Sequence, residues 1–225
     1  MGLFSRLLKV SAAGSVATVG VFFGATRNDV FEPMSSFDPI FHSSFFKKYN
    51  PNDNPTLHDK CVRRIPLDKI QPSLLEKKGK LVEAFCAGIW GGMGYIPQRA
   101  YLARKYQGPE TANHLWERTD LLSSTYEVGT LITDHFEVLE KNDDRILIRC
   151  GASPRERGVR ASDGLFEIGA VVKQEEGVAE FTLTSCFYQG LGKAESGPMP
   201  AHIEWLHQQY TKLWLETAVL KTCVQ

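Results

Sequence analysis

The C-terminal half of the chain has the pattern of two β-hairpins followed by one long helix. Residues 131–140 and 145–150 form the first pair of alternating segments, and residues 165–173 and 178–189 form the second. Residues 200–224 then repeat apolar side chains at helical spacing. A helix of this length can cross one face of such a sheet. We therefore predict an α+β fold in which an antiparallel sheet curves around the C-terminal helix and leaves a pocket between them.

The predicted pocket draws its walls from the apolar side of each element. In the first hairpin, Phe136 alternates with polar neighbours, and in the second Phe181 and Ser185 share a face. The stripe expected to face the sheet from the last helix comprises Ile203, Leu206, Tyr210, Leu213, Thr217, Leu220 and Val224. We expect Phe136, Phe181, Ser185 and Tyr210 to contact a bound ligand.

Composition excludes some partners of such a fold. The 225 residues include 26 basic and 26 acidic side chains, for a formal net charge of +0. No charge excess is available to hold a nucleic-acid backbone, so we predict no nucleic-acid partner. The five cysteines are scattered and odd in number, which argues against a disulfide framework and favours a reducing, intracellular compartment.

The first 57 residues differ from the rest. Residues 1–28 contain arginine, lysine, serine and apolar side chains but no acid, which is typical of a mitochondrial transit peptide. A weak membrane anchor and a loosely packed tail are the alternatives; without targeting, the protein would be cytoplasmic. Residues 29–57 are rich in proline, asparagine and phenylalanine, so we expect an irregular arm packed on the body. Residues 58–225 would form the body.

Upstream of the hairpins, residues 58–70 suggest an edge strand with Pro66 inside it. Helices are predicted over 74–89, 98–106 and 109–116. The glycine-rich stretch at 88–94 lacks the context of a phosphate-binding loop. A helix break is the simplest interpretation.

The functional alternative for that glycine-rich stretch is a gate at the pocket. Trp90 and Tyr95 would then be apolar contacts of the ligand.

Asp134 is the most specific candidate for a catalytic residue. It falls in register with Phe136 and would face the cavity, where a buried carboxylate needs a partner or a raised pKa. Arg99, Arg149 or Arg160 could supply the counter-charge. An interior ion pair is the structural alternative. His135 would point to the opposite face.

The connection between the hairpins carries the remaining candidates. Asp163 and Glu167 lie with several arginines near the expected pocket mouth, where they could contact an anionic head group. A solvated charged loop is the alternative. Tyr188 ends the last strand and is expected, with Asp134 and Arg149, to move protons or to orient a ligand.

Known catalytic and metal motifs do not occur in the sequence. The nucleophile elbow Gly-x-Ser-x-Gly and the zinc motif HExxH are missing, and His202 and His207 are spaced to face different directions on one helix. We predict no metal site and no cofactor.

Four segments of the sequence resemble an uncharacterised group of fungal proteins: residues 106–112, 114–118, 149–155 and 162–167. The resemblance covers residue 50 to the end. The order of elements is also similar to the helix-grip fold of the START and polyketide-cyclase superfamily (SRPBCC), whose members bind hydrophobic small molecules. The resemblance implies that fold and, because some of the fungal proteins are encoded beside polyketide pathways, a role near secondary metabolism. It assigns no catalytic residue.

Two functions of different class follow. The first is an accessory or tailoring enzyme of fungal polyketide metabolism, in which Asp134, Arg149 and Tyr188 would act on a bound chain. The second is a carrier of lipid or quinone at a mitochondrial or other membrane, which residues 1–28 would contact.

Overall fold

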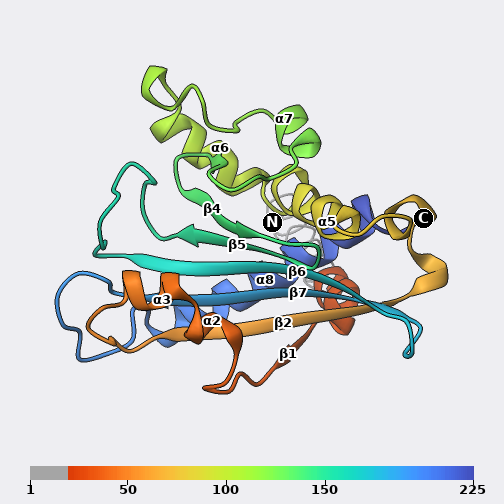
Figure 1. Ribbon diagram of the computed structural model, residues 1–225, viewed down its shortest axis with the longest axis horizontal. Helices are drawn as coiled ribbons and strands as arrows, with labels where there is room; N and C mark the ends of the chain where they lie inside the picture. The colour runs from red at the N-terminus through yellow and green to blue at the C-terminus, as the bar shows by residue number, and fades with distance from the viewer. Residues whose placement is uncertain (1–19) are drawn as a thin grey trace, which may run out of the picture.

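The computed structural model describes residues 20–225. Its centre is one seven-stranded sheet in the order β1-β2-β7-β6-β5-β4-β3, in which every neighbouring pair is antiparallel (Figure 1). The strands are β1 (Val30–Glu32), β2 (Leu57–Pro66), β3 (Leu131–Ile132), β4 (Phe136–Lys141), β5 (Arg145–Cys150), β6 (Asp163–Lys173) and β7 (Val178–Tyr188). The α-helices are α2 (Pro39–His42), α3 (Ser44–Tyr49), α4 (Pro72–Leu75), α5 (Lys80–Gly91), α6 (Ile96–Tyr106), α7 (Arg118–Ser123) and α8 (Ala201–Thr222). The predicted α+β class, antiparallel sheet and C-terminal helix are confirmed.

The second hairpin follows the sequence pattern closely. β6 and β7 pair without a break from Asp163 opposite Tyr188 to Lys173 opposite Val178. Alternation places Phe166 and Phe181 on the inner face, where they are buried, and Leu165 and Cys186 on the outer face. β2 then adds to the outer side of β7 and is itself covered by β1 over only a few residues, so it lies near the sheet edge as predicted.

The first hairpin has a break that its alternation did not predict. Thr133 and Asp134 adopt left-handed backbone conformations, with φ of 49° and 51°. Non-glycine residues rarely occupy this region. The continuous strand expected over 131–140 is therefore split into β3 and β4, which pair antiparallel across a turn at residues 133–135 and place Ile132 opposite Phe136.

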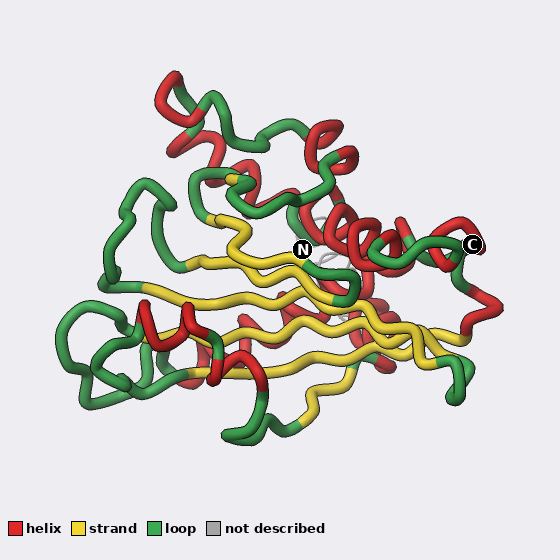
Figure 2. The backbone as a smooth tube through the Cα atoms, in the orientation of Figure 1, coloured by secondary structure: helices red, strands yellow, loops and turns green. Residues whose placement is uncertain are grey.

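The main core lies between the inner face of the sheet and two helices, α5 and α8. Figure 2 shows the strands as one layer with helical segments on both of its sides. The orientation predicted for α8 is wrong. Ile203, Leu206 and Leu220 are half exposed, and the buried face instead includes Leu215 and Ala218.

The close contact between α5 and α8 explains why residue 88 is a glycine. A Cβ on Gly88 would lie 2.8 Å from the carbonyl oxygen of Ala218, so only glycine allows the helices to approach this closely. α5 accordingly continues through Gly88 and ends at Gly91.

The single helix predicted from residue 74 is instead two helices, α4 and α5. Gly79, which has a φ of +82°, lies between them.

Downstream of α5, the helix predicted over 98–106 is present as α6. The helix predicted over 109–116 is reduced to one 3-10 turn, Pro109–Thr111, and α7 follows it.

The arm of residues 33–56 packs on the outer face of the sheet, as expected, but it contains the short helices α2 and α3 (Figure 1). Ile40 and Tyr49 of the arm are buried against Leu147, Leu165 and neighbouring side chains. The sheet is therefore covered on both faces.

Most of the predicted targeting or anchoring segment, residues 1–28, lies outside the described residues. Among residues 20–225, no helix combines the length and the apolar character needed to cross a membrane. All five cysteines are buried free thiols.

Candidate functional site

A cavity of about 230 Å³ lies between α8 and the inner face of the sheet. The sheet contributes residues from β4 to β7, α6 contributes Gln98, and the loop before α8 contributes Met199. The lining residues are Gln98, His135, Phe136, Cys150, Gly151, Ser162, Phe166, Phe187, Met199, His207, Tyr210, Thr211 and Trp214. Its position matches the pocket predicted between sheet and helix.

Aromatic rings make up much of the cavity wall. Phe136, Phe166 and Trp214 line it directly, and Trp90 packs behind them with its ring centroid 4.6 Å from that of Phe136 and 5.4 Å from that of Trp214. Trp90 and Tyr95 are thus buried supports of the wall rather than members of a gate, which corrects the functional alternative for 88–94.

Two residues from distant parts of the chain form a polar pair beside this apolar wall. Nε2 of His207, on α8, lies 3.1 Å from Oδ2 of Asp59, on β2. The side chain of Asp59 is 6% exposed and that of His207 is 18% exposed. The His207 ring also packs edge-on against Phe187, with centroids 5.0 Å apart. This packing fixes the imidazole between the carboxylate and the cavity.

Several buried polar atoms near this pair have no hydrogen-bond partner within the described part of the chain. They are both carboxylate oxygens of Asp59, the hydroxyl of Ser185 and the hydroxyl of Tyr210. Ser185 stands opposite Asp59 in the β2–β7 ladder. Burying such groups without partners is costly, so a bound ligand or water is expected to satisfy them.

Burial changes the proton affinity of other groups in the cavity wall. Burial, helped by Arg160, lowers the pKa of His135, so its imidazole is neutral at pH 7. Burial raises the pKa of Tyr210, which keeps its hydroxyl protonated and able to donate a hydrogen bond. The thiol of Cys150 also has a pKa raised by burial and is inert at neutral pH.

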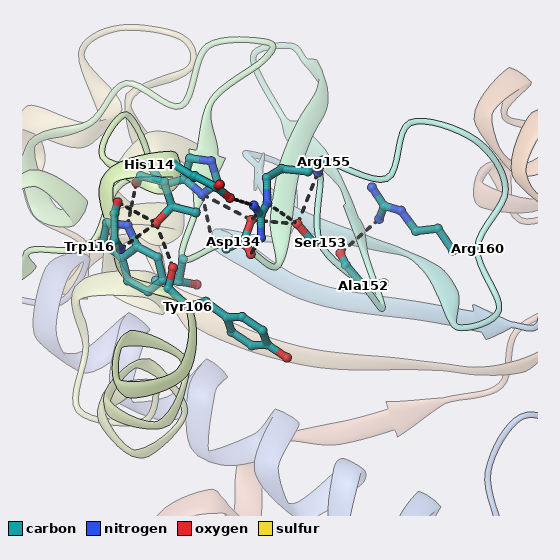
Figure 3. Close-up of polar contacts among 12 residues, drawn as sticks. Tyr106, His114, Trp116, Asp134, Ala152, Ser153, Arg155 and Arg160 are labelled. Carbon is teal, nitrogen blue, oxygen red and sulfur yellow. Dashed lines mark hydrogen bonds and ion pairs between the residues drawn. The ribbon is translucent and has the colours of Figure 1, made fainter.

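Asp134 does not line the cavity, which corrects its predicted orientation. Its left-handed conformation turns the carboxylate toward the β5–β6 loop, where Oδ1 accepts a hydrogen bond from Ser153 at 2.7 Å and Oδ2 contacts Arg155 at 3.4 Å (Figure 3). His135 takes the place in the cavity wall that was expected for Asp134. The partner arginine is Arg155, not the predicted Arg99, Arg149 or Arg160.

Arg149 and Tyr188 lie on the outer face of the sheet, so neither can reach a ligand in the cavity. Arg149 donates to both carboxylate oxygens of Asp163, at 2.9 Å and 2.6 Å, and its guanidinium lies 3.5 Å from the ring centroid of Tyr49. Tyr188 packs edge-on against Phe46 of the arm. Asp134, Arg149 and Tyr188 are therefore not brought together.

The remaining predicted contacts are also distributed over the fold. Asp163 is held in the ion pair with Arg149, and Glu167 pairs with Arg145 on the outer face at 2.9 Å. Arg99 donates to the carbonyl oxygen of Trp116 at 3.1 Å.

Of the predicted residues on the inner face, Phe181 packs in the core against Phe85. Phe136 and Tyr210 line the cavity.

No role in the cavity was predicted for His207 or Asp59. The available signal was weak: Asp59 is an acid within an alternating strand, and His207 lies on the helix that covers the sheet. Only the pairing of β2 with β7 brings the two together.

Within residues 20–225 there is no group of three side chains arranged to hold a metal ion. Comparison of the sequence with protein-family models gives no match. Comparison with curated proteins gives none either.

Proposed function

We propose that this protein binds a hydrophobic small molecule, carrying at least one polar group, in the cavity between the sheet and α8. The observation that carries the proposal is the cavity itself. Phe136, Phe166 and Trp214 form its wall, and beside them lies the Tyr210 hydroxyl, which has no hydrogen-bond partner in the described part of the chain. Ligand sites of this kind combine apolar walls with a few polar groups that fix orientation.

A helix-grip fold supports the same proposal. The covering of one sheet face by a long C-terminal helix agrees with that fold, as does the position of the cavity. The narrower role, an accessory enzyme of fungal polyketide or related metabolism, rests on the sequence resemblance. Transport of a lipid or quinone at a membrane stays a prediction that depends on residues 1–28.

The first test measures binding of 8-anilinonaphthalene-1-sulfonate, whose fluorescence rises in apolar surroundings. Ser162 lies exposed at the cavity edge, so Ser162→Trp should obstruct the cavity without altering the core. Thr211→Trp should fill it from α8. Leu220→Trp is the control, because Leu220 is 54% exposed on the same helix and does not line the cavity.

We expect both cavity variants to weaken dye binding at least about 10-fold, because a steric block removes most of the buried contact area. Leu220→Trp should bind as the wild type does. Equal binding by all four proteins would place the dye elsewhere and contradict the proposal. Mass spectrometry of small molecules that co-purify from the native host would then identify the natural ligand class.

A further inference from the structure

We propose that His207, oriented by Asp59, is a general base that removes a proton from carbon in the bound molecule. The inference rests on the proposed function, since it requires a ligand in the cavity. It adds a reaction class, proton transfer, and a substrate class, an apolar molecule with an acidic C–H beside a carbonyl or similar electron-accepting group.

The orientation of the imidazole carries the first step. Nε2 faces the carboxylate of Asp59 at 3.1 Å and the hydroxyl of Thr211 at 3.4 Å. The negative charge of a carboxylate beside one ring nitrogen favours the proton on that nitrogen even without an aligned hydrogen bond, which leaves the other nitrogen as the base. In the described structure Nδ1 of His207 has no hydrogen-bond partner, so it is free to accept a proton.

The surroundings of Asp59 carry the second step. The acid is buried on the inner face of β2, and neither of its oxygens accepts an aligned hydrogen bond from the described residues. A carboxylate that lacks other donors is best stabilised when its imidazole partner becomes positively charged. When His207 takes up a proton, it therefore forms an ion pair with a carboxylate that already lies beside it.

Tyr210 supplies a hydrogen-bond donor for the substrate oxygen on which negative charge develops. It lines the same cavity, lies one helical turn from His207 on α8, and has a hydroxyl without a hydrogen-bond partner among residues 20–225. When the C–H bond breaks, the proton moves to Nδ1 of His207 and the electron pair moves onto the carbonyl oxygen. The Tyr210 hydroxyl can donate a hydrogen bond to that oxygen.

His135 and Cys150 also line the cavity and are the competing candidates for a base. The Asp134 carboxylate next to His135 is already held by Ser153 and Arg155, and burial makes the thiol of Cys150 a poor source of thiolate. The geometry therefore points to His207.

The test uses 5-nitrobenzisoxazole, a general reporter of bases in apolar sites. A base removes its ring C–H proton, the electron pair forms a nitrile, and the N–O bond breaks to release a coloured nitrophenolate. We expect wild-type protein to accelerate this reaction over imidazole buffer. His207→Gln should lower the protein-catalysed rate about 100-fold or more, and Asp59→Asn about 10-fold or more.

His202→Gln is the matched control, because His202 is exposed on the same helix outside the cavity. It should leave the rate unchanged. A rate retained in His207→Gln, or lost equally in His202→Gln, would overturn the assignment. Circular dichroism and dye binding show whether each variant is folded with its cavity intact.

The two proposals fail differently. If the benzisoxazole displaces the dye but does not react faster than in imidazole buffer, the base assignment fails while ligand binding stands. If Ser162→Trp leaves dye binding unchanged, the proposed function fails.

Nitrogen chemical shifts of neutral His207 provide a test that needs no ligand. The proton is expected on Nε2 in the wild type and shared between the two ring nitrogens in Asp59→Asn. A wild-type proton on Nδ1 would overturn the proposal.

Discussion

The backbone N–H of Asp134 donates a hydrogen bond to Nδ1 of His114 at 3.1 Å (Figure 3). Both side chains are buried, and the His114 ring stacks on Trp116 with the planes 7° apart. The bond holds Asp134 in its left-handed conformation, and that conformation directs the next residue, His135, into the cavity wall. A buried histidine outside the cavity thus determines part of its lining.

Replacing His114 should loosen this turn. His114→Ala leaves the Asp134 N–H buried without an acceptor, so we expect a loss of about 1–3 kcal/mol in the free energy of unfolding. Urea denaturation measures the loss, and hydrogen exchange of the Asp134 amide should become faster. His202→Ala, at an exposed site on α8, should be close to neutral. An unchanged exchange rate in His114→Ala would show that the hydrogen bond does not hold the turn.

The ion pair between Arg149 and Asp163 should be structural. Arg149→Met leaves the Asp163 carboxylate buried without its main partner, so we expect destabilisation by about 3–5 kcal/mol. Arg157→Met is the control, because Arg157 is 69% exposed and its pair with Glu137 should contribute no more than about 1 kcal/mol. Thermal and urea unfolding compare the two, and similar losses would contradict the structural role.

The same variant should release the arm from the outer face of the sheet. The guanidinium of Arg149 stacks on Tyr49, so its loss removes a contact that holds α3 in place. Limited proteolysis should cut within residues 33–56 faster in Arg149→Met than in Arg157→Met. Equal rates of cleavage would indicate that the apolar contacts of α2 and α3 suffice.

Asp29 should make stability depend on pH. Burial, reinforced by the nearby Glu216 carboxylate and opposed by Arg63, raises the pKa of Asp29 from 3.8 to about 8. The folded protein therefore binds a proton that the unfolded chain releases, so this group's contribution to stability is complete below about pH 4 and is lost as the pH rises toward 8.

Asp29→Asn should remove this contribution. Urea unfolding from pH 4 to pH 9 should show a stability that falls less steeply with pH in Asp29→Asn than in the wild type. Asp68→Asn, at a side chain that is 73% exposed, should follow the wild type. Parallel curves for all three proteins would show that Asp29 does not take up a proton on folding.

Gly88 should be intolerant of any side chain. In Gly88→Ala the new methyl would lie 2.8 Å from the carbonyl oxygen and 3.0 Å from the Cα of Ala218, both backbone atoms of α8. We expect the clash to outweigh the gain in helix propensity and to cost about 1–3 kcal/mol. Gly158→Ala, where a methyl meets no atom within 4 Å, should be nearly neutral. A stabilised Gly88→Ala protein would show that the helices can separate easily.

The second hairpin and the extent of the last helix could be predicted from the sequence. Alternation runs through residues 165–173 and 178–188 on either side of the turn at 174–177, and a pattern of period two has one way to place a given face inward. The extent of α8 follows from helical spacing up to the C-terminal end. These signals are local, so tertiary contacts reinforce them without changing them.

The facing of α8 could not be predicted in the same way. The helix carries apolar residues on more than one side, so Ile203 and Leu206 formed a plausible stripe although they are half exposed. The buried side is selected by the close approach of α5 at Gly88 and by the cavity wall around Trp214. The face of α8 that becomes buried is therefore set by its packing partner, α5.

Periodicity within single segments was enough to predict the α+β class, the antiparallel hairpins and the presence of a covering helix. Which polar groups meet depends instead on how distant segments pack. Asp59 and His207 are joined because β2 pairs with β7 beneath α8, and His135 faces the cavity because two non-glycine residues adopt left-handed conformations. Neither arrangement leaves a local pattern, since both are maintained by contacts between residues far apart in the chain.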